Sequence, residues 1–276
     1  MFALAACTTN DPTETSTAMS TTTEPPITIR YGDAPEQFGE LHLPRRVSGA
    51  GGDGALAPAV VLVHGGFWRN PYDLTLMDPI AADLVARGIA VWNIEYRRLG
   101  DDGGGWPGTL TDVAAAVDHL AVVAGDHPID LHRVSIVGHS AGGHLALWAA
   151  GRAGLPADAP GAGPAVVPTV AVGQGAVVDL LGAASKPLGN GAVMELLGGT
   201  PDEVPERYEA ARPRLDAGPR MVSVVGTNDD VVPPPYSVDP NRPATIEVVE
   251  IDGAGHMDLI EPDHAAWAAV LRVLAD

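Results

Sequence analysis

A serine lies between two apolar segments in the sequence Gly138-His139-Ser140-Ala141-Gly142. Residues 134–137 are an apolar run that favours a buried strand, and the alanine- and leucine-rich residues 141–150 favour a helix. A strand-to-helix turn of small residues exposes a serine hydroxyl at the edge of a sheet, where it can attack an acyl group. The motif alone occurs by chance in many proteins, but this context favours Ser140 as a nucleophile. His139 either lines the pocket or is simply a residue that suits the turn.

Acyl transfer also requires hydrogen-bond donors aimed at the oxyanion that forms during attack. The first N–H groups of the predicted helix, which begins at Ala141, have no partner inside the helix. The segment His64-Gly65-Gly66-Phe67-Trp68 follows the apolar run 59–63 and resembles the HGG-type oxyanion loop of lipases and esterases. We therefore expect the N–H groups of Gly66, Phe67 and Ala141 to form an oxyanion hole. The alternative is that the glycines only form a turn at the exit of a strand.

From residue 59 to the carboxyl terminus, the chain resembles α/β-hydrolases of the esterase/lipase group. The string His-Gly-Gly-Phe-Trp is most similar to kynurenine formamidases and to feruloyl and acetyl-xylan esterases. Residues 95–99 (Glu-Tyr-Arg-Arg-Leu), then Trp106-Pro107-Gly108 and Asp112, resemble a segment of the hormone-sensitive-lipase branch. That branch usually has an aspartate at the position of His139 and a third glycine at the position of Phe67.

The resemblance implies a catalytic triad in the chain order serine, acid, histidine. Residues 226–233 resemble the acid loop of the family and place Asp229 in the acid role, with Asp230 as the fallback. His256 follows Gly253-Ala254-Gly255, where the catalytic histidine of the family stands, whereas His264 falls in the predicted last helix. His256 would accept the proton of the serine, and the acid would orient its imidazole.

Apolar strand-like runs alternate with helical segments, which predicts a doubly wound, mostly parallel α/β sheet of the α/β-hydrolase fold. The first two strands suit an antiparallel edge. The strands are expected at 27–31, 37–43, 59–63, 89–94, 134–137, 166–172, 221–225 and 246–251, and the helices at 73–86, 109–124, 141–150 and 264–274. Residues 179–218, rich in Gly, Leu and Pro, interrupt this alternation and are expected to form a small lid with one short helix near 192–197.

The net charge of −19 disfavours nucleic acid as a partner, since no cluster of Lys or Arg is longer than two residues. Neutral substrates fit this charge better than anionic ones. One cysteine, Cys7, excludes an internal disulfide and a CxxC-type site. The sequence has no HExxH motif and no dinucleotide fingerprint on its first strand, so no metal ion and no cofactor is expected.

Residues 4–7, Leu-Ala-Ala-Cys, resemble a bacterial lipobox, although the six residues before Cys7 are too few for a full signal peptide. We expect residues 1–26 to be a signal remnant and a Thr/Ser/Pro-rich tether, and residues 27–276 to be the folded domain. This predicts an extracytoplasmic lipoprotein anchored to a membrane through a lipidated Cys7. The alternative is a cytoplasmic enzyme with a ragged terminus and a chance cysteine.

The expected reaction is the hydrolysis of carboxylic esters through an acyl-enzyme on Ser140. A short lid, together with the rings of Phe67, Trp68 and Trp106 near the pocket, favours short acyl groups. The alternative is that these rings pack inside against the lid and carry no information about specificity. An amide hydrolase, either arylformamidase-like or a peptidase, would use the same triad and is the main alternative. A catalytically silent binding relative or a dehalogenase-like relative is less consistent with a sequence that keeps the serine, acid and histidine.

Overall fold

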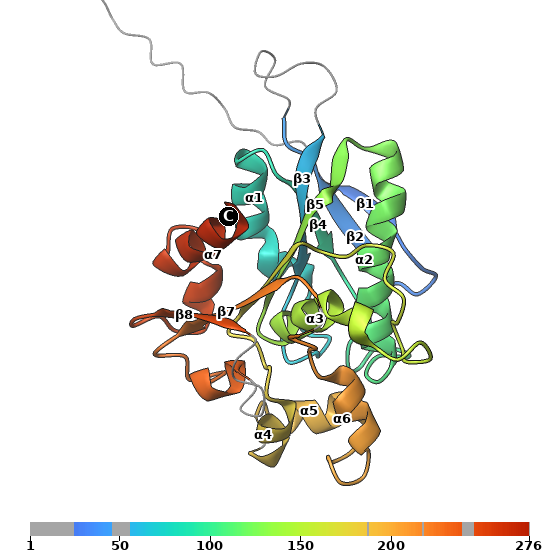
Figure 1. The fold of residues 1–276 in the computed structure, drawn as a ribbon, viewed down its shortest axis with the longest axis vertical. Helices are drawn as coiled ribbons and strands as arrows, with labels where there is room; N and C mark the ends of the chain where they lie inside the picture. The colour runs from blue at the N-terminus through green and yellow to red at the C-terminus, as the bar shows by residue number, and fades with distance from the viewer. Residues whose placement is uncertain (1–24, 46–55, 187, 217, 239–245, 276) are drawn as a thin grey trace, which may run out of the picture.

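The computed structural model describes residues 25–45, 56–186, 188–216, 218–238 and 246–275, and in this part of the chain one eight-stranded sheet forms the centre (Figure 1). The strand order is β1-β2-β4-β3-β5-β6-β7-β8. The pairs β1–β2 and β2–β4 are antiparallel, and all other neighbours are parallel. The strands span Ile27–Arg30 (β1), Phe38–His42 (β2), Ala57–Val63 (β3), Ala90–Ile94 (β4), Ile129–His139 (β5), Val170–Gln174 (β6), Arg220–Gly226 (β7) and Glu247–Ile251 (β8).

Four longer helices cover the two faces of the sheet, so that its central strands are buried on both sides (Figure 1). One face packs against α1 (Asp78–Ala86) and α7 (Ala265–Ala275). The other face packs against α2 (Gly108–Asp126) and α3 (Ala141–Ala150). Burial on both faces explains why β3 is a continuous apolar run and why β4 is apolar except for the buried Asn93. This arrangement confirms the predicted doubly wound, mostly parallel fold.

The segment expected to be a lid contains three short helices and not one. They are α4 (Leu180–Ser185), α5 (Ala192–Leu197) and α6 (Pro205–Ala211), and they lie together below the sheet in Figure 1. The sequence predicted α5 but missed the other two, which are only six and seven residues long and show too few turns for a helical period. Local signals were present, because Asp179 accepts a hydrogen bond from the N–H of Gly182 and Pro205 opens α6.

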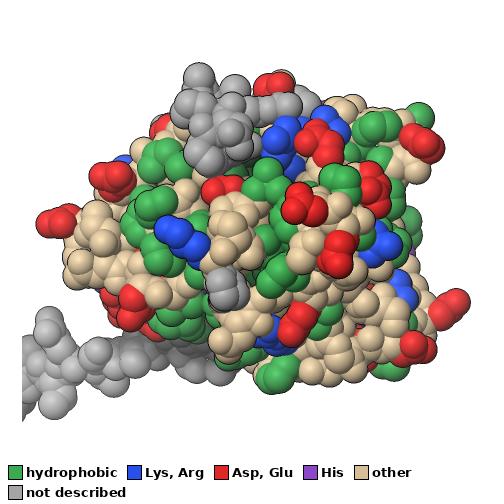
Figure 2. Space-filling model, turned by 90° about the horizontal axis from the view of Figure 1, so that it is seen from below, with side chains coloured by type: hydrophobic (Ala, Val, Ile, Leu, Met, Phe, Trp, Pro, Cys, Tyr) green, Lys and Arg blue, Asp and Glu red, His purple; other side chains and the backbone are tan. Residues whose placement is uncertain are grey.

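Four 3₁₀ turns join these elements: η1 (Leu74–Met77), η2 (Arg152–Gly154), η3 (Pro234–Ser237) and η4 (Met257–Ile260). The expected first helix is therefore divided into η1 and α1. Seen from the side of α4, α5 and α6, acidic, basic and apolar side chains are interspersed over the described surface (Figure 2). No helix among the described residues is long and apolar enough to span a membrane.

Candidate active site

Ser140 occupies a sharp turn between β5 and α3. Its backbone has φ 55° and ψ −122°, a combination that L-residues seldom adopt and that costs on the order of 1–3 kcal/mol. The turn is held by a hydrogen bond of 2.8 Å from the Ser140 N–H to the carbonyl of Gln174. A side chain at position 142 would not fit, because a Cβ on Gly142 would lie 2.2 Å from the carbonyl oxygens of Val63 and His64. The strand–turn–helix context predicted for Ser140 is therefore present.

His256 and Asp229 meet at the carboxyl ends of β8 and β7. The two side chains are buried, and Nδ1 of His256 lies 2.7 Å from Oδ2 of Asp229. Since a carboxylate only accepts, Nδ1 carries a proton, and Nε2 is left free to accept one. The other carboxylate oxygen, Oδ1, accepts from the N–H groups of Val231 and Val232 at 3.0 and 2.8 Å. The carboxylate is thus fixed on both sides, which is the arrangement that orients an imidazole for proton transfer.

The alternative acid and histidine lie elsewhere. Asp230 is exposed. His264 lies just before α7 and not inside it, and its Nδ1 accepts from the N–H of Ala266 at 3.1 Å. It therefore caps the helix.

The loop after β3 places backbone N–H groups beside the serine. A Cβ on Gly65 would lie 2.9 Å from Cβ of Ser140, which shows how closely this loop approaches the turn. Phe67 and Trp68 both have positive φ, 52° and 56°, a strained conformation for residues with bulky side chains. Among the described residues, the N–H groups of Gly66, Phe67 and Ala141 have no acceptor. They are the donors that the sequence predicted for an oxyanion hole.

A buried polar cluster supports this loop from behind. Nε2 of His64 lies 2.9 Å from Oε1 of Glu95, and its Nδ1 lies 2.8 Å from the carbonyl of Gly65. The Tyr96 ring stacks on that of His64 at 4.4 Å, and its hydroxyl donates to the carbonyl of His64 at 2.8 Å. Burial raises the pKa of Tyr96 well above its usual value, so this hydroxyl stays protonated and can donate.

The same cluster extends to the far end of the loop. The N–H of Leu74 donates to Oε2 of Glu95 at 3.1 Å, and Arg98 donates both to that carboxylate and to the carbonyl of Tyr72. The sequence singled out residues 95–99 by resemblance alone. Their contact with the loop was not readable, because it joins residues about thirty positions apart on neighbouring strands.

One cavity of about 210 Å³ is lined by Ser140 and His256, whereas Asp229 and Ala141 do not line it. Its polar lining consists of Ser140, His139 and His256 with the backbone of Gly66. Its apolar lining is made of Phe67, Tyr72, Leu76, Val231 and Met257.

Two tryptophans expected at the cavity do not line it. Trp68 is fully buried, because the left-handed backbone turns its ring into the core, where it meets the ring of His144 edge-on at 5.5 Å. Trp106 is partly buried and packs against the core. Its backbone N–H donates to the carbonyl of Leu196 in α5 at 2.7 Å. The prediction that these two rings bind substrate is therefore corrected.

Contacts with α5 and α6 hold the lid on the domain. Arg69 donates to the carbonyl of Gly189 and forms a 2.7 Å ion pair with Glu195. On the side of the sheet, His144 and Trp148 of α3 donate to the carbonyls of Ala211 and Ala210 at 2.8 and 2.9 Å. The lid thus packs on both the loop after β3 and the helix that follows Ser140.

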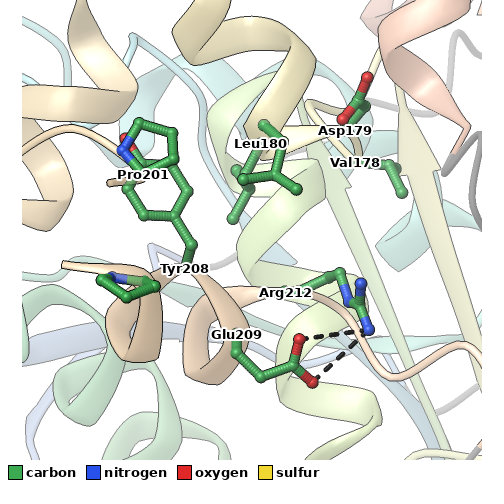
Figure 3. Close-up of a pocket in the computed structure, with 9 residues that line it drawn as sticks. Val178, Asp179, Leu180, Pro201, Tyr208, Glu209 and Arg212 are labelled. Carbon is green, nitrogen blue, oxygen red and sulfur yellow. Dashed lines mark hydrogen bonds and ion pairs between the residues drawn. The ribbon is translucent and has the colours of Figure 1, made fainter. Parts of the chain in front are cut away.

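A second cavity of about 180 Å³ lies between residues 178–181 and α6 (Figure 3). Of its three charged lining residues, Asp179, Glu209 and Arg212, the last two form an ion pair with each other. None of the proposed catalytic residues lines it. Within the described ranges, no group of three or more His, Cys, Asp or Glu side chains could hold a metal ion.

The chain is similar to known proteins over most of its length. The BD-FAE family model matches residues 50–241. The hydrolase acrC of Aspergillus aculeatus is 35% identical over 125 residues, which cover 41% of this chain and 28% of that protein. The chain therefore spans less than a third of the length of this relative.

Two solved structures share the fold at low sequence identity. A truncated carbohydrate esterase from gut microbiota has a TM-score of 0.72 and 21% identity, with 92% of this chain and 96% of that chain covered. Esterase B of Lactobacillus rhamnosis also has a TM-score of 0.72 and 21% identity, with 91% and 84% covered. With the family match over more than half of its residues, the chain belongs to the BD-FAE family and has the α/β-hydrolase fold.

Proposed function

We propose that this protein is a serine esterase that cleaves short-acyl carboxylic esters through an acyl-enzyme on Ser140. The observation that carries the proposal is the buried Asp229–His256 pair, at 2.7 Å, whose histidine lines the same cavity as the strained Ser140. The names of the similar structures, a carbohydrate esterase and esterase B, support ester hydrolysis. A complex of esterase B with a tributyrin phosphonate is a further similar structure, with a TM-score of 0.69.

In this proposal each residue of the site has a defined role. His256 accepts the proton of the Ser140 hydroxyl through Nε2 while Oγ attacks the ester carbonyl, and Asp229 stabilises the imidazolium. The N–H groups of Gly66, Phe67 and Ala141 stabilise the oxyanion. The imidazolium then returns its proton to the leaving alcohol, and water cleaves the acyl-enzyme by the same steps.

The second candidate is an amide hydrolase, since the triad and the oxyanion hole would serve both bonds. Initial rates on p-nitrophenyl acetate, an arylformamide and a dipeptide amide separate the two. We expect the ester to be cleaved fastest. A higher kcat/KM on the arylformamide than on p-nitrophenyl acetate would show that the protein is a formamidase and not an esterase.

The matched variants are Ser140→Ala and Ser185→Ala. Ser185 is exposed at the end of α4, so its loss should leave the rate and the labelling by a fluorophosphonate unchanged. Ser140→Ala should lose labelling and retain less than about one thousandth of kcat/KM. Full labelling of Ser140→Ala would contradict the assignment of the nucleophile.

A further inference from the structure

His139, the residue before Ser140, binds the turn that carries His256. Its side chain is buried, and its Nε2 lies 3.1 Å from the backbone oxygen of His256. Since a carbonyl oxygen only accepts, the proton of the ring is on Nε2, and this N–H donates the bond. The bond joins two segments 117 positions apart in the chain.

The two imidazole rings are also in contact. Their centroids are 4.4 Å apart, and their planes are tilted by 44°. Burial, together with the neighbouring His256, lowers the pKa of His139 to about 3. Its Nδ1 has no hydrogen-bond partner among the described residues. His139 is therefore neutral at the pH values at which His256 would act as a base.

A neutral ring suits this position because His256 becomes an imidazolium during proton transfer. A second cation at this distance would repel that charge, whereas a neutral aromatic ring attracts it. The titratable groups that face His256 are Asp229 from the loop after β7 and His139 from the serine turn. Asp258, two positions along the chain, accepts from the N–H of Gly255 at 2.8 Å.

We propose that His139 is a positioning residue for His256: its Nε2–H fixes the backbone of His256, and its neutral ring packs against the imidazole and favours the imidazolium. The inference rests on the proposed function, because it takes His256 as the base.

Two substitutions separate the hydrogen bond from the ring. His139→Gln keeps an N–H donor of similar reach but has no ring, and His139→Leu has neither. We expect His139→Leu to lower kcat on p-nitrophenyl acetate by about 10- to 100-fold with little change in KM. His139→Gln should recover kcat to within about threefold of the native value.

The pH profile is the measurement that a merely structural role would not change. Loss of the ring should remove a contact that stabilises the His256 imidazolium, so the acid limb of kcat/KM should move to lower pH by about half a unit in both variants. The matched controls are His144→Gln and His144→Leu. His144 is equally buried and donates to the carbonyl of Ala211, and its ring contact is with Trp68, so its loss should lower the melting temperature but leave the acid limb in place.

An unchanged acid limb in His139→Gln would overturn the inference, and so would an equal shift in the His144 variants. His139→Gln decides the question even where His139→Leu does not fold. These failures differ from failure of the proposed function, in which the native protein itself would hydrolyse no ester and would not be labelled at Ser140.

Discussion

Two adjacent aspartates at the end of β7 differ in every respect that matters for catalysis. Asp229 is buried, accepts two backbone N–H groups and lies 2.7 Å from His256, whereas Asp230 is exposed. We predict that Asp229→Asn lowers kcat/KM by about 10³- to 10⁴-fold, because the amide would favour the wrong tautomer of His256. Asp230→Asn, the matched control, should stay within about twofold of the native rate. Steady-state rates on p-nitrophenyl acetate test both variants. A larger loss of kcat/KM in Asp230→Asn than in Asp229→Asn would assign the acid role to Asp230.

The residues of the site differ in how far the sequence could reveal them. Ser140, Asp229 and His256 stand in local motifs at the ends of strands, so their positions were readable without the fold. The location of Trp68 was not readable from the sequence. Two consecutive positive φ angles turn its ring into the core, and at bulky residues such angles leave no signal in the sequence. The contact between His139 and His256 depends on how two distant turns meet.

At the scale of elements, the cluster at the end of β4 acts on the oxyanion loop as a whole. Glu95 accepts from Leu74 and Tyr96 and pairs with His64 and Arg98 inside the protein. Removal of one charge from such a cluster leaves its partners unpaired, which costs several kcal/mol when they are buried. Glu95→Gln is therefore expected to lower both the melting temperature and kcat.

Tyr96→Phe should have a smaller effect than Glu95→Gln. It keeps the ring stacked on His64 and removes only the 2.8 Å bond to the His64 carbonyl, worth about 0.5–1.5 kcal/mol. We expect a loss of kcat that is smaller than for Glu95→Gln, with KM nearly unchanged. Thermal unfolding and steady-state kinetics of the two variants check this order. Native kcat in a stably folded Glu95→Gln would show that the loop holds its shape without the cluster.

The central elements were predictable because each is a long run with one clear pattern. The central strands of the parallel sheet are largely apolar, and α3 matches its predicted bounds. The ends were less predictable: β5 starts at Ile129, where the polar residues Asp130, His132 and Arg133 hide the strand, and β6 begins four residues later than expected. Pairing with a neighbouring strand decides these ends, and pairing is not a local property.

At the scale of the whole molecule, two buried neutral histidines predict a loss of stability in acid. Burial lowers the pKa of His144 to about 4 and that of His139 to about 3. Below about pH 6.5 the unfolded chain binds protons that the folded protein does not, so stability falls as the pH falls towards 4. Each histidine contributes about 2 kcal/mol to the difference between pH 8 and pH 5.

His144→Gln tests this contribution, because glutamine can still donate to the carbonyl of Ala211 but does not titrate. The free energy of unfolding from urea titrations at pH 8 and pH 5 should fall by about 2 kcal/mol less in the variant than in the native protein. An identical fall in both proteins would mean that His144 is accessible enough to be protonated in the folded state.

The location of the protein is a separate prediction, since Cys7 lies outside the described residues. We propose that Cys7 is lipidated and anchors the enzyme to a membrane. Labelling with a palmitate analogue in the native host should mark the protein, and Cys7→Ser should lose the label and release the enzyme. Thr8→Ser is the control and should keep both the label and the association with the membrane. Native protein that carries no label and fractionates free of membranes would contradict the proposal.

The final prediction concerns the length of the acyl chain. The cavity beside Ser140 has a volume of about 210 Å³, below the range of about 300–1,000 Å³ that is usual for sites that enclose drug-sized ligands. Phe67, on one side of it, packs against Gly189 of the lid, and Leu76 and Val231 occupy further space with partly buried side chains. A long chain would therefore have to leave the cavity past Tyr72 or Met257, which are 46% and 50% exposed.

Along a series of p-nitrophenyl esters, we expect kcat/KM to peak between acetate and butyrate and to fall by octanoate. Leu76→Ala should widen the cavity and raise the ratio of octanoate to acetate rates. Leu181→Ala is the matched control, because Leu181 lines the second cavity and not this one, and it should leave the ratio unchanged. A native rate that rises through decanoate would mean that the exposed side chains of Tyr72 and Met257 form an apolar path for long chains, and the short-acyl assignment would then be wrong.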